Sequence, residues 1–319
     1  MKLKKKKKGG TFMKLVPVFS VLSALALTTV LISPNVTLAR TENSVDVNKR
    51  IEQLIDSSDG MDANTFLEKL VEKRSQIEPD PESTEKGLVI AEEIDNINDE
   101  LGTDKTRSKR SASKYDKNTA KLRAGNMIEL TLNADEGLSS RDITTIYSAA
   151  NEARDLAKEK FSRNVGWEDA YRHFAWNHIA AKKIGIADTR IATNNHEWGL
   201  LLIDPVLNYH EKRYKHYKDK GNGNGNAANK ALGDTVNEIP YLKKNLIRVF
   251  DRDFNTFRKF VPDATIMDWN NNDYGRAYAA KYPDLETALK KAKDYLITDE
   301  NSVSKSEYKK VWKNNWYKN

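Results

Sequence analysis

Apolar residues recur at intervals of three and four along most of this chain, and this helical period is what most constrains its fold. Behind a Ser-Ser-Arg-Asp start at residue 139, the period runs through Ile143, Ile146 and Ala150 to Phe161. Only the run MIELTL at 127–132 has a composition that favours a β-strand. The sequence therefore predicts a mainly α fold, with a helical core domain preceded by a small acidic helical segment.

The first 39 residues have the features of a secretory signal peptide. A lysine run precedes an apolar stretch from Leu15 to Ile32, and small residues lead to a cleavage site after Ala39. Met13 is an alternative start, because the Lys-Gly-Gly before it can be encoded by a purine-rich ribosome-binding site. No stop-transfer cluster follows the apolar stretch, so we expect a secreted protein that begins at Arg40, either extracellular or associated with the cell wall.

The positive net charge belongs to this leader. The chain has 53 lysine and arginine residues against 46 acidic ones, but residues 1–39 carry seven lysines and no acid, which leaves the remainder balanced. Charge therefore gives no argument for nucleic-acid binding. The chain has no cysteine, which for an exported protein favours a Gram-positive envelope over a disulfide-forming compartment.

Charge is distributed unevenly within the mature chain, and this asymmetry locates a domain boundary. Residues 40–110 are acidic and residues 111–319 are basic, so the two parts should attract each other. A polar joint with a dibasic Lys109-Arg110 separates them. We predict an acidic helical N-terminal segment at 40–110, which serves as a linker or a removable pro-region. A helical C-terminal domain is predicted at 111–319. A flexible loop is expected at GNGNGN, residues 221–226.

The segment DAYRHFAWNHIA, residues 169–180, combines strongly polar side chains with alanines and aromatic residues. On a helix, Asp169, Arg172, His173 and Asn177 share one face, because they are separated by three or four positions. Apolar residues surround the rest of the helix, so this polar stripe should be buried and its charges paired or used. A buried salt bridge with a core histidine explains the stripe as well as a functional site does.

Two further segments carry polar residues of the same kind. TNNHEWG places His196 beside Glu197 after an Asn-rich helix start, and MDWNNNDYGR, residues 267–276, is expected to form a polar turn. Together, D-A-Y-R-H-x-x-W-N, H-E and M-D-x-x-N-N-x-x-G-R resemble a bacterial domain family of unknown function, found in exported proteins and at the ends of polymorphic-toxin-like chains. The resemblance covers about residues 165–280. It implies a toxin-like role without a defined reaction, and the family commonly has histidine where this chain has Asn270.

Better-known motifs do not fit these residues. His196-Glu197 lacks the second histidine of a zinc protease, since Leu200 stands in its place. DWNNNDYGRAYA lacks both the glycine and the final glutamate of a calcium-binding loop. Two chemistries remain open. Histidines and carboxylates could hold a divalent metal that activates water, with arginine facing an anionic substrate. Alternatively, His173 oriented by Asp169 could act as a general base, with asparagine and arginine stabilising an oxyanion.

The sequence thus predicts a secreted hydrolase-like or toxin-like domain, metal-assisted in one version, acting on an anionic, phosphodiester-type substrate. The alternative is a non-catalytic module that binds a cell-envelope component, in which the polar motifs form a buried structural network. An immunity-type protein is a candidate partner. The candidate catalytic residues are Asp169, Arg172, His173, His196 and Glu197, the candidate substrate-binding residues are Asn177, Asn271, Asn272 and Arg276, and the candidate metal ligands are His173, His196, Glu197 and Asp268.

Overall fold

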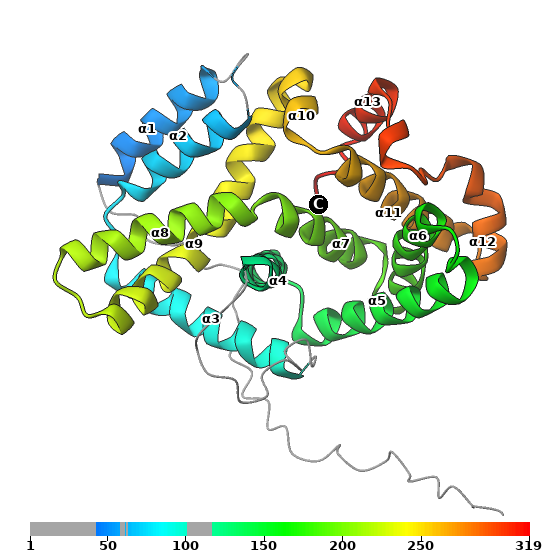
Figure 1. Cartoon of the computed structure of the whole chain (residues 1–319), viewed down its shortest axis with the longest axis horizontal. Coiled ribbons are helices and arrows are strands. Elements are labelled where there is room, and N and C mark those ends of the chain that lie inside the picture. Colours follow the sequence, from blue (N-terminus) through cyan, green and yellow to red (C-terminus); the bar gives the residue numbers. More distant parts are fainter. Residues whose placement is uncertain (1–42, 58–60, 62, 101–116) are drawn as a thin grey trace, which may run out of the picture. The chain divides into compact units, whose positions relative to one another are not determined.

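The computed structural model describes residues 43–57, 61, 63–100 and 117–319. These residues contain thirteen α-helices, two short 3-10 helices and no β-strand, which confirms the mainly α prediction (Figure 1). They all belong to one compact unit. None of the described helices has both the length and the apolar character that a membrane crossing requires. The predicted signal peptide and the Lys109-Arg110 joint lie outside the described residues.

The N-terminal helices pack directly on later ones. They are α1 (Asn43–Asp56), α2 (Ala63–Ser75) and α3 (Pro81–Glu100), and α3 lies along α9 (Asn224–Arg252). Gly87 makes this close approach possible, because a Cβ there would lie 2.1 Å from the carbonyl oxygen of Gly233. The acidic segment and the chain after residue 116 therefore share one packed interior.

Ion pairs connect the acidic segment with the helices that follow. The buried guanidinium of Arg74 pairs with Glu238, and its Nη2 donates to Oε2 at 2.7 Å. Nearer the surface, Arg248 pairs with Glu52, and Arg252 Nη1 lies 2.6 Å from Asp56 Oδ1. The two surface pairs join acids of residues 40–110 to arginines of the later part, whereas the buried Arg74–Glu238 pair has the opposite arrangement. Whether residues 40–110 are removed in the mature protein stays a prediction.

The remaining helices bring the polar motifs together. Helix α6 contacts α5, α7, α11 and α12, and Ser139 caps α5 as its sequence predicts, with its hydroxyl accepting from the amide of Asp142. The helices are α4 (Lys117–Asp135), α5 (Ser140–Phe161), α6 (Val165–Ile184), α7 (Ile186–Leu201), α8 (Ile203–Asp219), α10 (Phe254–Phe260), α11 (Asp263–Lys281), α12 (Leu285–Ala292) and α13 (Lys305–Lys313), with 3-10 turns at Lys293–Tyr295 and Glu300–Ser302.

The strand expected at MIELTL is wrong, because residues 127–132 lie inside α4. Ile128, Leu130 and Leu132 are all buried, and α4 contacts α3, α7, α8 and α9. A helix covered on several sides has apolar residues all around it, so it loses the one-sided pattern that identifies helices in sequence.

The turn expected at residues 267–276 is also wrong, because the whole segment lies in α11. Asparagine is a poor helix former, since its amide competes with the backbone for hydrogen bonds. Here the amides have partners outside the helix: Asn270 Nδ2 donates to Tyr295 O at 3.0 Å, and Asn271 Nδ2 donates to Ile297 O at 2.9 Å. These tertiary bonds remove the competition and allow the helix.

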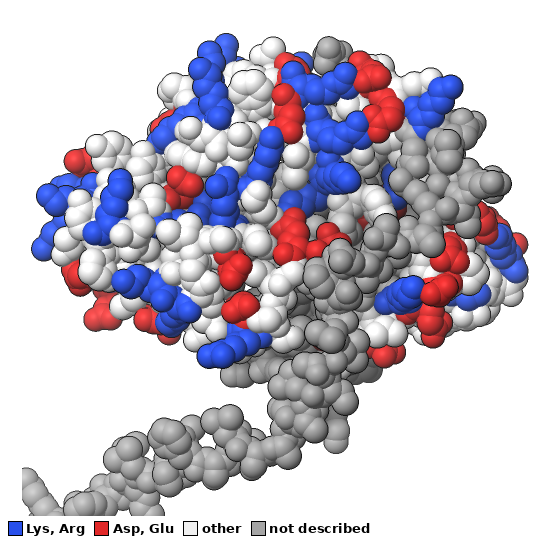
Figure 2. All heavy atoms as spheres, turned by 180° about the vertical axis from the view of Figure 1, so that it is seen from behind, with Lys and Arg blue, Asp and Glu red and all other residues white. Residues whose placement is uncertain are grey.

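Two smaller expectations also differ from the structure. The TNNHEWG segment lies in the second half of α7 and not at a helix start. Helix α9 begins at Asn224, so only the first part of GNGNGN is a loop. On the surface, basic and acidic side chains are interspersed over the face shown in Figure 2. This mixture agrees with the balanced charge of the chain after its leader.

Candidate functional site

Helices α6 and α11 cross at Gly275, and this crossing builds the site. A Cβ at residue 275 would lie 2.4 Å from the carbonyl oxygen of Phe174 and 2.7 Å from the Cβ of Asn177, so only glycine allows the two helices to approach this closely. The contact places His173 of α6 beside Asp268 and Asn272 of α11. Glu197 of α7 completes the group from a third helix.

One ring nitrogen of His173 is fixed by Asn272. The Oδ1 of Asn272 lies 3.1 Å from His173 Nδ1 and accepts from Asn177 Nδ2 at 2.6 Å, while Asn272 Nδ2 donates to Glu197 Oε1 at 3.3 Å. These two neighbours set the orientation of the amide, so its oxygen must face the imidazole. His173 therefore carries its proton on Nδ1, and Nε2 presents a lone pair.

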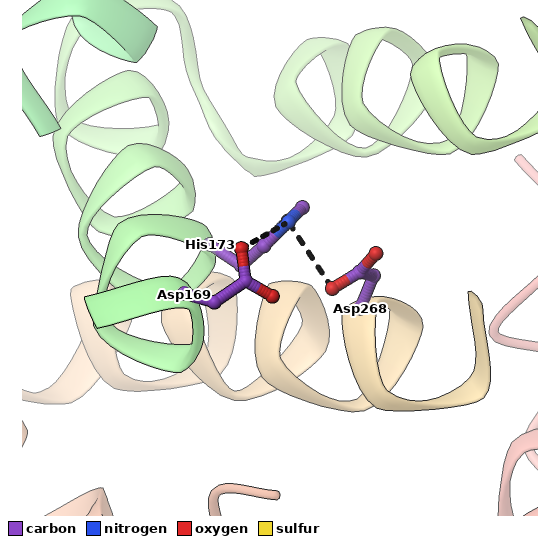
Figure 3. A group of neighbouring side chains, drawn as sticks. All are labelled: Asp169, His173 and Asp268. Carbon is purple, nitrogen blue, oxygen red and sulfur yellow. Dashed lines mark ion pairs between the residues drawn. The ribbon is translucent and has the colours of Figure 1, made fainter. Parts of the chain in front are cut away.

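The Nε2 lone pair of His173 faces two carboxylates and a guanidinium. Asp268 Oδ1 lies 3.1 Å away and Asp169 Oδ1 lies 4.0 Å away, one from each of the crossing helices (Figure 3). Arg172 Nη2 donates to Nε2 at 2.9 Å and to Asp169 Oδ1 at 2.5 Å. Burial, followed by the charges of Arg172 and His196, lowers the pKa of His173 well below 6.5, so the ring is neutral.

One carboxylate oxygen of Asp268 is buried without a hydrogen bond from the described residues. Its side chain is largely buried, and Oδ1 has no hydrogen-bond partner among the described residues although His173 Nε2 is 3.1 Å away. A carboxylate oxygen and an imidazole lone pair repel each other, so a proton or a cation is needed beside them. Burial, followed by the charges of Glu197 and Asp169, raises the pKa of Asp268 well above 3.8.

The geometry of this group suits a metal ion. One donor atom from each of Asp169, His173 and Asp268 can be chosen so that all lie within 4.8 Å of one another. Two ligands about 2.1 Å from one ion, at an angle of about 90–110°, are separated by about 3.0–3.4 Å. The 3.1 Å between His173 and Asp268 fits this distance. Asp169 is partly exposed, so its side chain has freedom to close the remaining gap.

Glu197 is fully buried on the other side of His173. Its Oε1 lies 3.8 Å from Nδ1, and its Oε2 has no hydrogen-bond partner within the described part of the chain. Burial raises the pKa of Glu197 to about 7, against the lowering effects of His196, Arg172 and Asn272. Asn272 connects Glu197 with His173, because its Nδ2 donates to Glu197 Oε1 while its Oδ1 accepts from His173 Nδ1. Glu197 thus helps to orient His173 through this amide.

The predicted substrate-binding residues lie beneath the site and contact protein groups. Asn177, Asn271 and Asn272 are fully buried, and Arg276 is 2% exposed. Arg276 Nη1 donates to Asn177 Oδ1 and to Thr193 Oγ1, both at 2.8 Å. Burial lowers the pKa of Arg276 to about 10, which leaves it charged at neutral pH. This network holds Asn177 and Asn272 in position and does not face solvent.

His196 pairs with Glu129. Its Nδ1 lies 2.9 Å from Glu129 Oε2, and its ring packs edge-on against Trp176 with centroids 5.3 Å apart. Burial lowers the pKa of His196, but Glu129 outweighs this effect and raises it to about 9. His196 is therefore protonated at neutral pH. The structure does not bring it to the carboxylates of Asp169 and Asp268.

A small cavity lies beside the site. It encloses about 110 Å³ between α4, α5, α6 and α7 and has mostly apolar walls. Arg172 lines both this cavity and the carboxylate group, so the two are adjacent. The lining residues are Asn126, Glu129, Ile146, Tyr147, Ala150, Arg172, Trp176 and His196.

Replacing His196 with glutamine should destabilise the protein in a pH-dependent way. The folded-state pKa of about 9 lies above the unfolded value of 6.5, so the stabilisation is fully present below pH 6.5 and disappears as pH rises through 9. We expect a loss of about 1.5–3 kcal/mol at pH 6, as for a hydrogen bond between charged groups, and little loss at pH 9.5. Chemical denaturation at these two pH values measures it.

His178→Gln is the matched control for His196→Gln. Burial lowers the pKa of His178, so the contribution of this residue decreases as pH falls below 6.5, the opposite direction. The same cost for His196→Gln at both pH values would contradict the assignment of a charged pair with Glu129.

Comparison with known proteins adds no further information. No protein-family model, no curated protein and no solved structure matches this chain.

Proposed function

We propose that the protein is a metal-assisted hydrolase of an anionic, phosphodiester-type substrate, exported by the signal sequence at residues 1–39. The observation that carries the proposal is the contact between Asp268 and His173. A neutral imidazole, whose lone pair is fixed by Asn272, lies 3.1 Å from a buried carboxylate oxygen that has no hydrogen bond from the described residues. Two acceptors held this close need a proton or a cation between them, and we assign a divalent cation to this position.

In this proposal Asp169, His173 and Asp268 hold one divalent ion. Three protein ligands leave coordination positions open, as in catalytic metal sites, and the ion would lower the pKa of a water molecule and polarise the substrate. Asn272 and Glu197 orient His173 from behind. Arg172 and protonated His196 line the adjacent cavity together with Glu129, so one positive charge remains there to favour a negatively charged group. A leaving group that enters this cavity would find a proton donor in His196.

The same residues would serve a general-base mechanism less well. The Nε2 lone pair of His173 is buried and accepts from Arg172, whereas a general base needs the proton of its substrate within hydrogen-bond reach. Here Asn272 is the hydrogen-bond partner of Nδ1, with Glu197 at 3.8 Å, and Nε2 is surrounded by two carboxylates. An anionic substrate would be repelled by these carboxylates unless a cation neutralised them.

Metal binding to the purified protein tests the proposal. We expect calorimetry with Mn²⁺ and Zn²⁺ to show one site, and hydrolysis of bis(p-nitrophenyl) phosphate to require the metal and stop with a chelator. His173→Gln should weaken metal binding by about 100-fold or more. Replacing a residue that only orients a ligand typically costs less, about 10–100-fold. His178→Gln is the control, because His178 is a buried histidine of the same helix whose Nε2 contacts Tyr282 O.

The outcome separates the two classes of function. Equal metal binding by both variants, or none by the unaltered protein, would contradict the hydrolase and leave the buried network as a structural device. In that case the alternative of a non-catalytic module that binds a cell-envelope component would account for the polar motifs.

A further inference from the structure

The guanidinium of Arg172 occupies the position where the proposed metal site requires a cation. Its Nη2 lies 2.5 Å from Asp169 Oδ1 and 2.9 Å from His173 Nε2. Both atoms belong to the residues that could hold an ion, together with Asp268. The Nε2 atom has one lone pair, so it can accept from Arg172 or bind a metal but cannot do both.

We propose that Arg172 is a built-in counter-ion, which leaves the carboxylates when a divalent metal binds and then holds the anionic group of the substrate at the adjacent cavity. This inference rests on the metal-assisted function proposed above and adds a role for one residue. It makes the position of Arg172 dependent on the metal, so that the anion-binding group becomes available only when the metal is in place.

Charge balance provides the driving force for this movement. The guanidinium of Arg172 contributes one positive charge beside Asp169 and Asp268. A divalent ion neutralises both carboxylates by itself, and it would repel a guanidinium held within a few ångströms. The movement therefore exchanges one cation for another and leaves Arg172 with an unused charge.

Arg172 also has room to move and a place to go. About a third of its side chain is exposed, unlike the side chain of His173, which is 1% exposed. It already lines the cavity together with His196 and Trp176. A phosphate at the cavity mouth could accept two parallel hydrogen bonds from the guanidinium, an arrangement that arginine favours. Turning the side chain requires no change in the helices.

Two binding measurements on the purified protein test the inference. Arg172→Gln removes the competing cation, so we expect it to bind Mn²⁺ about 10-fold more tightly than the unaltered protein. With Mn²⁺ present, the same variant should bind inorganic phosphate about 10-fold more weakly. In the unaltered protein, Mn²⁺ should strengthen phosphate binding, and by reciprocity phosphate should strengthen Mn²⁺ binding by the same factor.

Arg163→Gln is the matched control, because it removes an exposed positive charge close to the start of α6 and should change neither affinity much. If Arg172→Gln binds Mn²⁺ no more tightly than the unaltered protein, while His173→Gln abolishes binding, the counter-ion role is wrong and the metal-assisted function stands. If neither the unaltered protein nor Arg172→Gln binds a metal, both proposals are wrong.

Discussion

Replacing Asp268 with asparagine is expected to stabilise the metal-free protein and at the same time abolish its metal binding. The carboxylate is largely buried beside Asp169 and Glu197, and its Oδ1 has no hydrogen bond within the described structure. Asparagine has nearly the same shape and carries no charge, so it removes the repulsion between the Asp268 carboxylate and its acidic neighbours. We expect a gain of about 1–3 kcal/mol near pH 8, the cost usually attached to an unsatisfied buried polar group.

The pH dependence gives this prediction a second signature. The folded-state pKa of Asp268 is raised above its unfolded value of 3.8, so its contribution to stability is most favourable below pH 3.8 and is lost as pH rises through the folded-state pKa. The advantage of Asp268→Asn should therefore be small at pH 4 and grow toward pH 8. Chemical denaturation in the presence of a chelator measures it, and calorimetry with Mn²⁺ measures the loss of binding.

Asp263→Asn is the matched control on the same helix. Asp263 lies in the first turn of α11 and accepts a hydrogen bond from Tyr308 at 2.8 Å, so its replacement should cost stability and leave metal binding intact. If Asp268→Asn is less stable than the unaltered protein at every pH, Asp268 is a structural residue. A gain in stability together with a loss of metal binding would instead identify Asp268 as a functional residue that is held at a cost in stability.

The pairing of Asp169 with His173 and the approach of Asp268 could be anticipated from the sequence to different degrees. A separation of four positions places Asp169 and His173 on one helix face, whatever the rest of the fold does. The contact with Asp268 depends on how α6 and α11 cross, and no local pattern encodes that crossing. The motif MDWNNNDYGR provided the residue, but Gly275 within it is what brings the helices together.

The adjacency of His196 and Glu197 in the sequence predicts that both belong to one site, and this grouping conceals the separate role of His196. Successive residues on a helix point about 100° apart, so two neighbours cannot easily serve one centre. In the structure Glu197 faces His173, while His196 faces Glu129 and the cavity. Glu129 was missed because it lies in the run expected to form a strand. A lone carboxylate among apolar residues was the signal, since a buried acid needs a partner.

Gly275→Ala should be among the most damaging single substitutions outside the proposed ligands. The added Cβ would lie 2.4 Å from the carbonyl oxygen of Phe174 and 2.7 Å from the Cβ of Asn177, and the first of these is a backbone atom that cannot turn away. Helices α6 and α11 would have to separate. We expect a net loss of about 2–4 kcal/mol, because the overpacking exceeds the gain of about 1 kcal/mol from alanine's higher helix propensity.

The same substitution should also weaken metal binding, even though Gly275 is not a ligand. Separating the helices lengthens two contacts of His173, each 3.1 Å long. The contact with Asn272 orients the ring, and the contact with Asp268 forms the site. Loss of such orienting contacts typically costs 10–100-fold in metal affinity.

Gly225→Ala is the control for this prediction. Gly225 lies near the start of α9 with no atom within 4 Å of the added Cβ, so the substitution should be neutral or slightly stabilising. Thermal denaturation measures the stability of the two variants, and calorimetry measures their Mn²⁺ affinity. If Gly275→Ala matched Gly225→Ala in both measurements, the proposed role of the α6–α11 crossing would be contradicted.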